Sequence, residues 1–145
     1  DMVHRRAGRT DRNRAVTGLA GETRSWLAAT GFAPRTESLW LEALTHGSFN
    51  GAGEETSDYQ RLEFLGDRVL GLAVASWLYQ AGDGPEGKLS QRLNALVSGT
   101  TCARIARAIG LPPHLRLGKQ AREDGGADSD KILGDVMEAL IGAAF

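Results

Sequence analysis

The sequence predicts an all-α protein that forms a single domain. Apolar residues recur three and four positions apart along most of the chain, the spacing that places them on one face of a helix. Glycine and proline fall between these stretches rather than at the short, regular intervals of an all-β protein. The 145 residues can bury one sizeable core, and no internal repeat divides them.

The N-terminal third predicts two short helices and a loop. We expect the first helix over residues 21–30, ended by Gly31, because glycine adopts the left-handed conformation that terminates helices. A second helix is expected over residues 36–46 and opens on a Thr or Ser cap. The polar, glycine-rich segment 47–58 then predicts a loop.

The middle of the chain predicts a long helix followed by one or two shorter helices. The long helix reaches about Gln80, and Ser57 or Asp58 can cap its start. Residues 88–109 have the apolar spacing of one helix or two, with residues 98–101 as the candidate joint.

The C-terminal part predicts a loop and a last helix. Gly110 and the two prolines that follow it end the preceding helical stretch. Residues 117–130 are rich in glycine and charge, so we expect them to lack regular structure. Asp128 or Ser129 can cap a final helix that runs to Phe145.

Composition and charge exclude several classes of protein. The net charge of −1 gives no overall signature of a nucleic-acid-binding protein. Cys102 is the single cysteine, so the chain has neither an internal disulfide nor a zinc ribbon. No apolar run is long enough to span a membrane, and we expect a soluble protein of the reducing cytoplasm.

Residues 1–17 predict a basic, flexible arm that precedes the domain at residues 18–145. Five arginines and two aspartates among the first 14 residues give this arm a net charge of +3. Two interpretations stay open: the arm is a solvated tail, or it contacts phosphate groups.

Two acidic residues of the long helix share a face with apolar residues. Glu63 and Asp67 are four positions apart and therefore lie one turn apart on the same face. The apolar residues of that face are Leu70, Val74 and Leu78. Removing an ionised carboxylate from water costs free energy unless the charge is paired. We expect no cation beside either acid, because Arg61 and Arg68 lie on other faces of the helix.

The last helix carries a second pair of acids in an apolar run. Asp135 and Glu138 are three positions apart and are neighbours on one face. Ala139 and Gly142 flank them, so a facing helix or a ligand can approach closely. Lys131 is the one cation on this face, and it lies one turn before Asp135.

Packing the two acidic helices in one core would bring four carboxylates together, and these would repel one another. A divalent cation would reverse that penalty, and all-oxygen ligation favours Mg²⁺ or Mn²⁺. Such a site suits phosphodiester hydrolysis, although it does not identify the substrate. Either pair taken alone is also compatible with a solvated helix face.

Several motifs resemble those of the ribonuclease III family. The stretch YQRLEFLGDRVL, which contains Glu63 and Asp67, is similar to the family signature. LTHGSF before it, and PEGKLSQRLNALV, LRLG and KILGDVMEALIGAAF after it, resemble further family motifs in the same order. The resemblance covers residues 21–145 and implies the helical endonuclease-domain fold of a bacterial ribonuclease III.

The resemblance implies an endoribonuclease that hydrolyses double-stranded RNA with a Mg²⁺-activated water and acts in rRNA and mRNA processing. Products with 5′-phosphates and short 3′ overhangs are expected. Four acids match the metal-binding positions: Glu63, Asp67, Asp135 and Glu138. Asp67 and Glu138 are the expected catalytic residues, and hydrolysis should depend most on Glu138. Mn²⁺ is the expected substitute for Mg²⁺, and no organic cofactor is expected.

The resemblance also implies a symmetric homodimer with a duplex-binding valley between two active sites. Phe64 matches an aromatic residue that enters a socket on the partner subunit, and a place in the chain's own core is the alternative. Glu86 matches an acid that some members place near the metal cluster, and a solvated loop charge is the alternative.

The chain departs from the family pattern at several positions. Gln60 stands where many members have Glu, Asp124 where many have Ser, and Lys131 where a small polar residue is common. We expect His46 to make helix-terminal hydrogen bonds rather than act as a base. The double-stranded-RNA-binding domain into which bacterial members usually continue is not among the 145 residues.

Two other functions are considered. A non-catalytic ribonuclease III-like module that binds RNA or acts as a dimeric scaffold should have lost one or more acids, and this chain keeps all four. A carboxylate bundle for oxidation or metal storage needs histidines on the acidic helices, and neither helix carries one.

Overall fold

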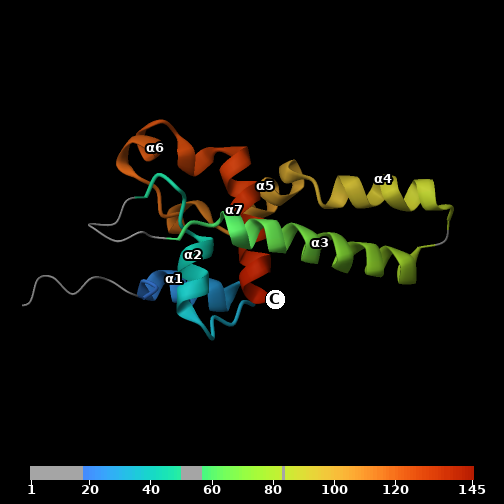
Figure 1. The fold of residues 1–145 in the computed structure, drawn as a ribbon, viewed down its shortest axis with the longest axis horizontal. Coiled ribbons are helices and arrows are strands. Elements are labelled where there is room, and N and C mark those ends of the chain that lie inside the picture. Colours follow the sequence, from blue (N-terminus) through green and yellow to red (C-terminus); the bar gives the residue numbers. More distant parts are fainter. Residues whose placement is uncertain (1–17, 50–56, 83) are drawn as a thin grey trace, which may run out of the picture.

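The computed structural model describes residues 18–49, 57–82 and 84–145, and these residues form the all-α fold that the sequence predicts (Figure 1). The basic arm predicted at residues 1–17 lies outside the described residues. The elements are α1 (Gly21–Ala29), α2 (Glu37–Ala43), α3 (Gln60–Ala81), α4 (Glu86–Leu96), α5 (Gly99–Ala108), η1 (Pro112–His114), α6 (Lys119–Glu123), η2 (Gly126–Asp128) and α7 (Asp130–Ala144).

Most helix ends lie close to the residues expected from the sequence, but two expected caps differ. Thr36 precedes α2 without a side-chain capping bond, and the N-cap of α3 is Tyr59 and not Ser57 or Asp58. Gly31 follows α1 with a φ of 90°, and Gly110 follows α5 with a φ of 78°. The side chain of Ser98 accepts a hydrogen bond from the backbone N–H of Thr101 at 3.2 Å, so the helical stretch divides at the predicted joint. Ser129 caps α7 in the same way.

The second helix is shorter than predicted. It ends at Ala43 rather than at residue 46, because the next residues pair with a segment far along the chain. The backbone N–H of His46 donates to the carbonyl of Arg116 at 2.9 Å, and the N–H of Arg116 donates to the carbonyl of Leu44 at 2.8 Å. This pairing forms an isolated parallel bridge at Thr45, and it withdraws these groups from the helix.

The expectation that residues 117–130 lack regular structure is wrong. They contain the one-turn helix α6 and the 3₁₀ turn η2, separated by Gly125 in the left-handed conformation at a φ of 83°. Side chains four positions apart bridge α6, as in the hydrogen bond of 3.0 Å from Gln120 to Asp124. Such a short helix is invisible to apolar periodicity, which needs about 11 residues or more to be detected.

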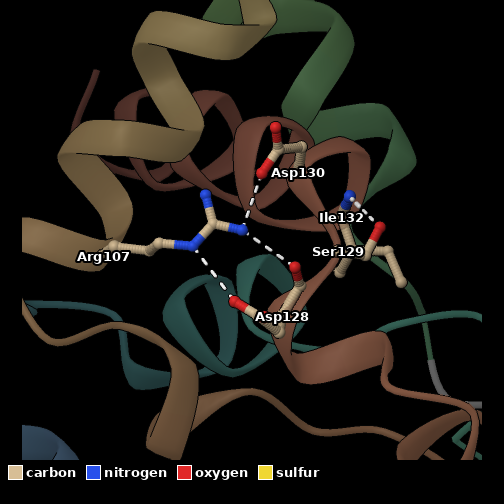
Figure 2. A network of polar contacts seen from close by, with 5 residues as sticks. All are labelled: Arg107, Asp128, Ser129, Asp130 and Ile132. Carbon is tan, nitrogen blue, oxygen red and sulfur yellow. Dashed lines mark hydrogen bonds and ion pairs between the residues drawn. The ribbon is translucent and has the colours of Figure 1, made fainter.

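Helix α7 lies at the centre of the fold and packs against α3 and α5. Its buried residues are Leu133, Gly134, Val136, Met137, Ala139, Leu140 and Gly142. The guanidinium of Arg107 on α5 clamps the start of α7 (Figure 2). It contacts Asp128 Oδ1 at 3.1 Å, the Asp128 carbonyl at 2.8 Å and Asp130 Oδ1 at 2.6 Å. This clamp fixes the position from which the acidic face of α7 begins.

Helix α3 runs outward from the body and α4 returns beside it, so the two form a projecting arm (Figure 1). The outer part of α3 exposes large apolar side chains: Leu72 is 74% exposed, Trp77 59% and Tyr79 81%. No helix in the described part of the chain is both long and apolar enough to cross a membrane.

Candidate metal centre

Helices α3 and α7 cross with their backbones in direct contact at two glycines. A Cβ on Gly66 would overlap the carbonyl oxygen of Glu138, and a Cβ on Gly142 would overlap the carbonyl oxygen of Leu62. The sequence indicated the bare surface beside Gly142, but the role of Gly66 was missed. Only the absence of both side chains allows this approach, which places the acidic faces of the two helices against each other.

The four predicted carboxylates influence one another electrostatically across this crossing. Burial raises the pKa of Glu138 to about 7, and the charges of Asp67, Glu63 and Asp135 add to the rise. The pKa of Glu63 is also raised, first by burial and then by Asp135. The packing of α3 against α7 therefore brings the four acids within electrostatic range of one another.

Asp135 has two partners in this arrangement. The Nζ of Lys131 lies 2.7 Å from Asp135 Oδ2, and the hydroxyl of Tyr59 donates to the same oxygen at 3.3 Å. Lys131 is the one cation that the sequence places on this face, one turn before Asp135. Tyr59 was missed, although its position next to the acidic helix and its buried ring are typical of a residue that supports a site.

The expectation that α3 provides no cation beside its acids is wrong. Arg68 Nη1 lies 2.6 Å from Asp67 Oδ2, and the guanidinium also lies 4.3 Å from the centre of the Phe64 ring. A helical wheel gives only the direction in which a side chain leaves the helix. The arginine side chain is long and flexible, so it can contact the adjacent residue even though the two leave the helix in different directions.

The donor chemistry of the site fits a hard cation. Four carboxylates and no histidine supply oxygen ligands of the kind that Mg²⁺ and Mn²⁺ prefer. Within the described ranges, no three acidic, histidine or cysteine side chains are arranged to hold an ion in their present conformations. Oδ2 of Asp67 contacts Arg68 and Oδ2 of Asp135 contacts Lys131, so these cations share the carboxylates that an ion would use.

Cys102 on α5 is buried near this site but is not a suitable ligand. Burial raises the pKa of its thiol to about 11, and the charges of Glu138 and Asp67 add to that rise. A thiol must lose its proton to ligate a metal, so Cys102 stays a neutral core residue at ordinary pH.

Glu86 is not brought to the four carboxylates within one chain. It is the first residue of α4, it is exposed, and it accepts a hydrogen bond from the hydroxyl of Ser90 at 2.5 Å. The start of α4 lies at the tip of the projecting arm, away from the crossing of α3 and α7 (Figure 1).

Phe64 lies on the surface rather than in the core of its own chain. Phe64, on α3, is 64% exposed, which contradicts the alternative of a place in the chain's own core. It borders a surface cavity of about 780 Å³ between α2 and α3. The residues that line this cavity are Leu39, Glu42, Gln60, Arg61, Leu62, Phe64 and Leu65.

His46 makes local hydrogen bonds, but in the turn after α2 and not at the helix end where they were expected. Its Nδ1 accepts from the backbone N–H of Ser48 at 3.1 Å and lies 2.7 Å from the Ser48 hydroxyl. That hydroxyl accepts in turn from the N–H of Gly118 at 3.0 Å. His46 therefore joins the turn after α2 to the segment before α6.

Comparison with known proteins identifies the family of the chain. Residues 36–145 match the family model described as ribonuclease-III-like. The chain belongs to the ribonuclease III family. It is 61% identical over 123 residues to ribonuclease 3 of Zymomonas mobilis, and the aligned residues cover 83% of this chain and 48% of that protein. It is 44% identical over 128 residues to ribonuclease 3 of Ruegeria pomeroyi, and the aligned residues cover 88% of this chain and 56% of that protein.

Solved structures of this family share the fold. Two structures of the nuclease domain of ribonuclease III from Campylobacter jejuni superpose with TM-scores of 0.74 and 0.75, at 34% and 30% identity. They cover 81% and 86% of this chain, and this chain covers 80% and 82% of theirs. The first is described as showing structural flexibility in a region involved in dimer formation. The chain spans about half the length of the curated relatives that it matches.

Proposed function

We propose that this chain is the catalytic domain of an endoribonuclease that hydrolyses double-stranded RNA with Mg²⁺, and that Mn²⁺ can replace the magnesium. The crossing of α3 and α7 at Gly66 and Gly142 carries this proposal, because it collects four carboxylates without enough positive charge to balance them. A divalent cation relieves that imbalance. The relatives named ribonuclease 3 support RNA as the substrate.

The residues of the site have distinct roles in this proposal. Glu63, Asp67, Asp135 and Glu138 would hold the ion, with Asp67 and Glu138 as the catalytic residues. When bound, such an ion lowers the pKa of water and neutralises charge on the phosphate and the leaving oxygen. Products would carry 5′-phosphates and short 3′ overhangs. Glu86, at the tip of the arm, has the weakest support as a further ligand.

Replacing Glu138 by Gln tests the proposed activity. The variant removes one negative ligand, so we expect cleavage of duplex RNA in Mg²⁺ to fall by about a thousandfold. Glu123→Gln, on the exposed helix α6, is the matched control and should cleave like the unmodified chain. Binding of duplex without cleavage by the unmodified chain would instead favour the non-catalytic scaffold.

The partner on the exposed face of α3 is proposed to be a second copy of this chain. In a two-fold interface the same surface patch of both subunits is in contact. The exposed ring of each subunit can therefore enter the cavity of the other. Phe64 and the cavity between α2 and α3 provide that combination. Sedimentation of Phe64→Asp should show a monomer where the unmodified chain is a dimer. Phe145→Asp, which alters another exposed aromatic residue, should leave the dimer intact.

Binding of duplex RNA by this domain is expected to be weak and to depend strongly on salt. The chain has a net charge of −1, so attraction to phosphates relies on local basic groups and not on overall charge. Cleavage should therefore fall steeply as salt is raised. A role in rRNA and mRNA processing and a place in the cytoplasm stay predictions from the sequence.

A further inference from the structure

Lys131 occupies an unusual place beside the carboxylates of the candidate metal centre. Its Nζ lies 2.7 Å from Asp135 Oδ2, yet its side chain is 81% exposed whereas that of Asp135 is only 17% exposed. The ammonium therefore approaches the site from solvent, the side from which a hydrated ion would also arrive. Its charge also extends to Glu63, whose pKa it lowers against the effect of the neighbouring acids.

The two donors on Asp135 are not equivalent. Tyr59 contributes a neutral hydroxyl, which orients the carboxylate without reducing its charge. Lys131 contributes a full positive charge at the shorter distance. A divalent ion bound by Asp135 would meet this charge at close range, either by displacing the ammonium or by binding beside it.

We propose that Lys131 sets the metal affinity of this centre, because its ammonium competes with the divalent cation for the negative charge of Asp135. The inference rests on the proposed metal centre. Lys131 is an affinity-determining residue and not a catalytic one. It makes occupancy of the site depend on a higher concentration of free metal than the four carboxylates alone would require.

The size of the effect follows from the charges. A unit charge and a divalent ion about 6 Å apart in water repel enough to weaken binding by about tenfold, and salt screens this repulsion. Exposed ion pairs of lysine and carboxylate contribute up to about a further fivefold where they must be broken. We therefore expect Lys131→Gln to bind a divalent ion about tenfold more tightly at low salt, and by a smaller factor at high salt.

Titration with Mn²⁺ tests the inference without RNA or activity. Electron paramagnetic resonance detects free Mn²⁺ and gives its dissociation constant for the purified chain. Lys131→Gln should tighten binding by about tenfold, whereas Lys131→Arg, which keeps the charge, should bind like the unmodified chain. Lys119→Gln is the matched control, since Lys119 also pairs with an acid four positions later, on the separate helix α6, at 3.8 Å. It should leave the affinity unchanged.

The possible outcomes are distinct. Unchanged affinity in Lys131→Gln overturns the inference, and weaker binding in that variant overturns it in favour of a role in holding Asp135 in position. Absence of Mn²⁺ binding by both the unmodified chain and Lys131→Gln would refute the metal centre itself. Binding that survives in Asp135→Asn with the same affinity would place the ion elsewhere and overturn both proposals.

Discussion

Gly66→Ala is the most direct test of the crossing that assembles the site. The added Cβ would overlap the carbonyl oxygen of Glu138 and lie 2.9 Å from the backbone nitrogen of Gly142. Both obstacles are backbone atoms of α7, so no side-chain rotation can make room. The helices must separate, and we expect the carboxylates on the two faces to separate with them.

The expected loss of stability follows from two opposing terms. Forcing an extra methyl group into a packed contact costs about 3 kcal/mol at the upper end of the usual range, and a rigid backbone neighbour favours that end. Alanine is better than glycine within a helix by about 1 kcal/mol. The net destabilisation is therefore about 2 kcal/mol, or about 8 °C in the melting temperature of a domain of this size.

Gly71→Ala provides the matched comparison on the same helix. A Cβ at Gly71 meets no atom within 4 Å, so this variant should gain about 0.5–1 kcal/mol from helix propensity alone. Thermal unfolding followed by circular dichroism at low protein concentration should rank the two variants on opposite sides of the unmodified chain. Equal melting temperatures for Gly66→Ala and Gly71→Ala would refute the crossing.

Three further predictions concern charge and hydrogen bonding around α7. The folded state raises the pKa of Glu138 from 4.5 to about 7 and raises that of Glu63, so folding favours the protonated forms. The metal-free protein should therefore lose stability as pH rises from about 5 to 8, and Glu138→Gln should flatten this dependence in melting curves recorded with a chelator. Arg107→Ala should lower the melting temperature because it removes three contacts at the start of α7. Arg104→Ala, at an exposed position one turn earlier, should leave it nearly unchanged. Tyr59→Phe should cost about 1 kcal/mol in urea unfolding through the loss of its bond to Asp135, and an unchanged midpoint would contradict that bond.

The pairing of the acids on two helix faces could be predicted from the sequence because each pair belongs to one helix. Spacing within a helix determines which side chains share a face, so Glu63 with Asp67 and Asp135 with Glu138 follow directly. The role of Gly66 could not be predicted in this way, since a glycine in a helix reports a close approach only when its neighbour is known. Arg68 was misplaced for a related reason: its ion pair depends on the reach of a flexible side chain.

The fold was predicted where helices are long and failed where they are short or meet distant segments. The long helix and the division near Ser98 follow from apolar spacing and a capping side chain, both of which are local. The early end of α2 depends on Arg116, more than 70 positions away. The helix at residues 119–123 is held by contacts within a single turn. Local sequence patterns carry no information on the contact that ends α2, and too little to detect a helix as short as that at residues 119–123.

The two acidic helices share one pattern, and that pattern explains why the site and the crossing are inseparable. On α3 the stripe of residues three and four apart carries Glu63, Gly66 and Asp67, and on α7 it carries Asp135, Glu138 and Gly142. Each glycine lies on the same stripe as two acids. Contact between the glycines therefore forces the acids together, at a cost that the raised pKa of Glu138 reflects. The burial of α7 offsets this cost in the folded protein, and a cation that binds the acids would remove it.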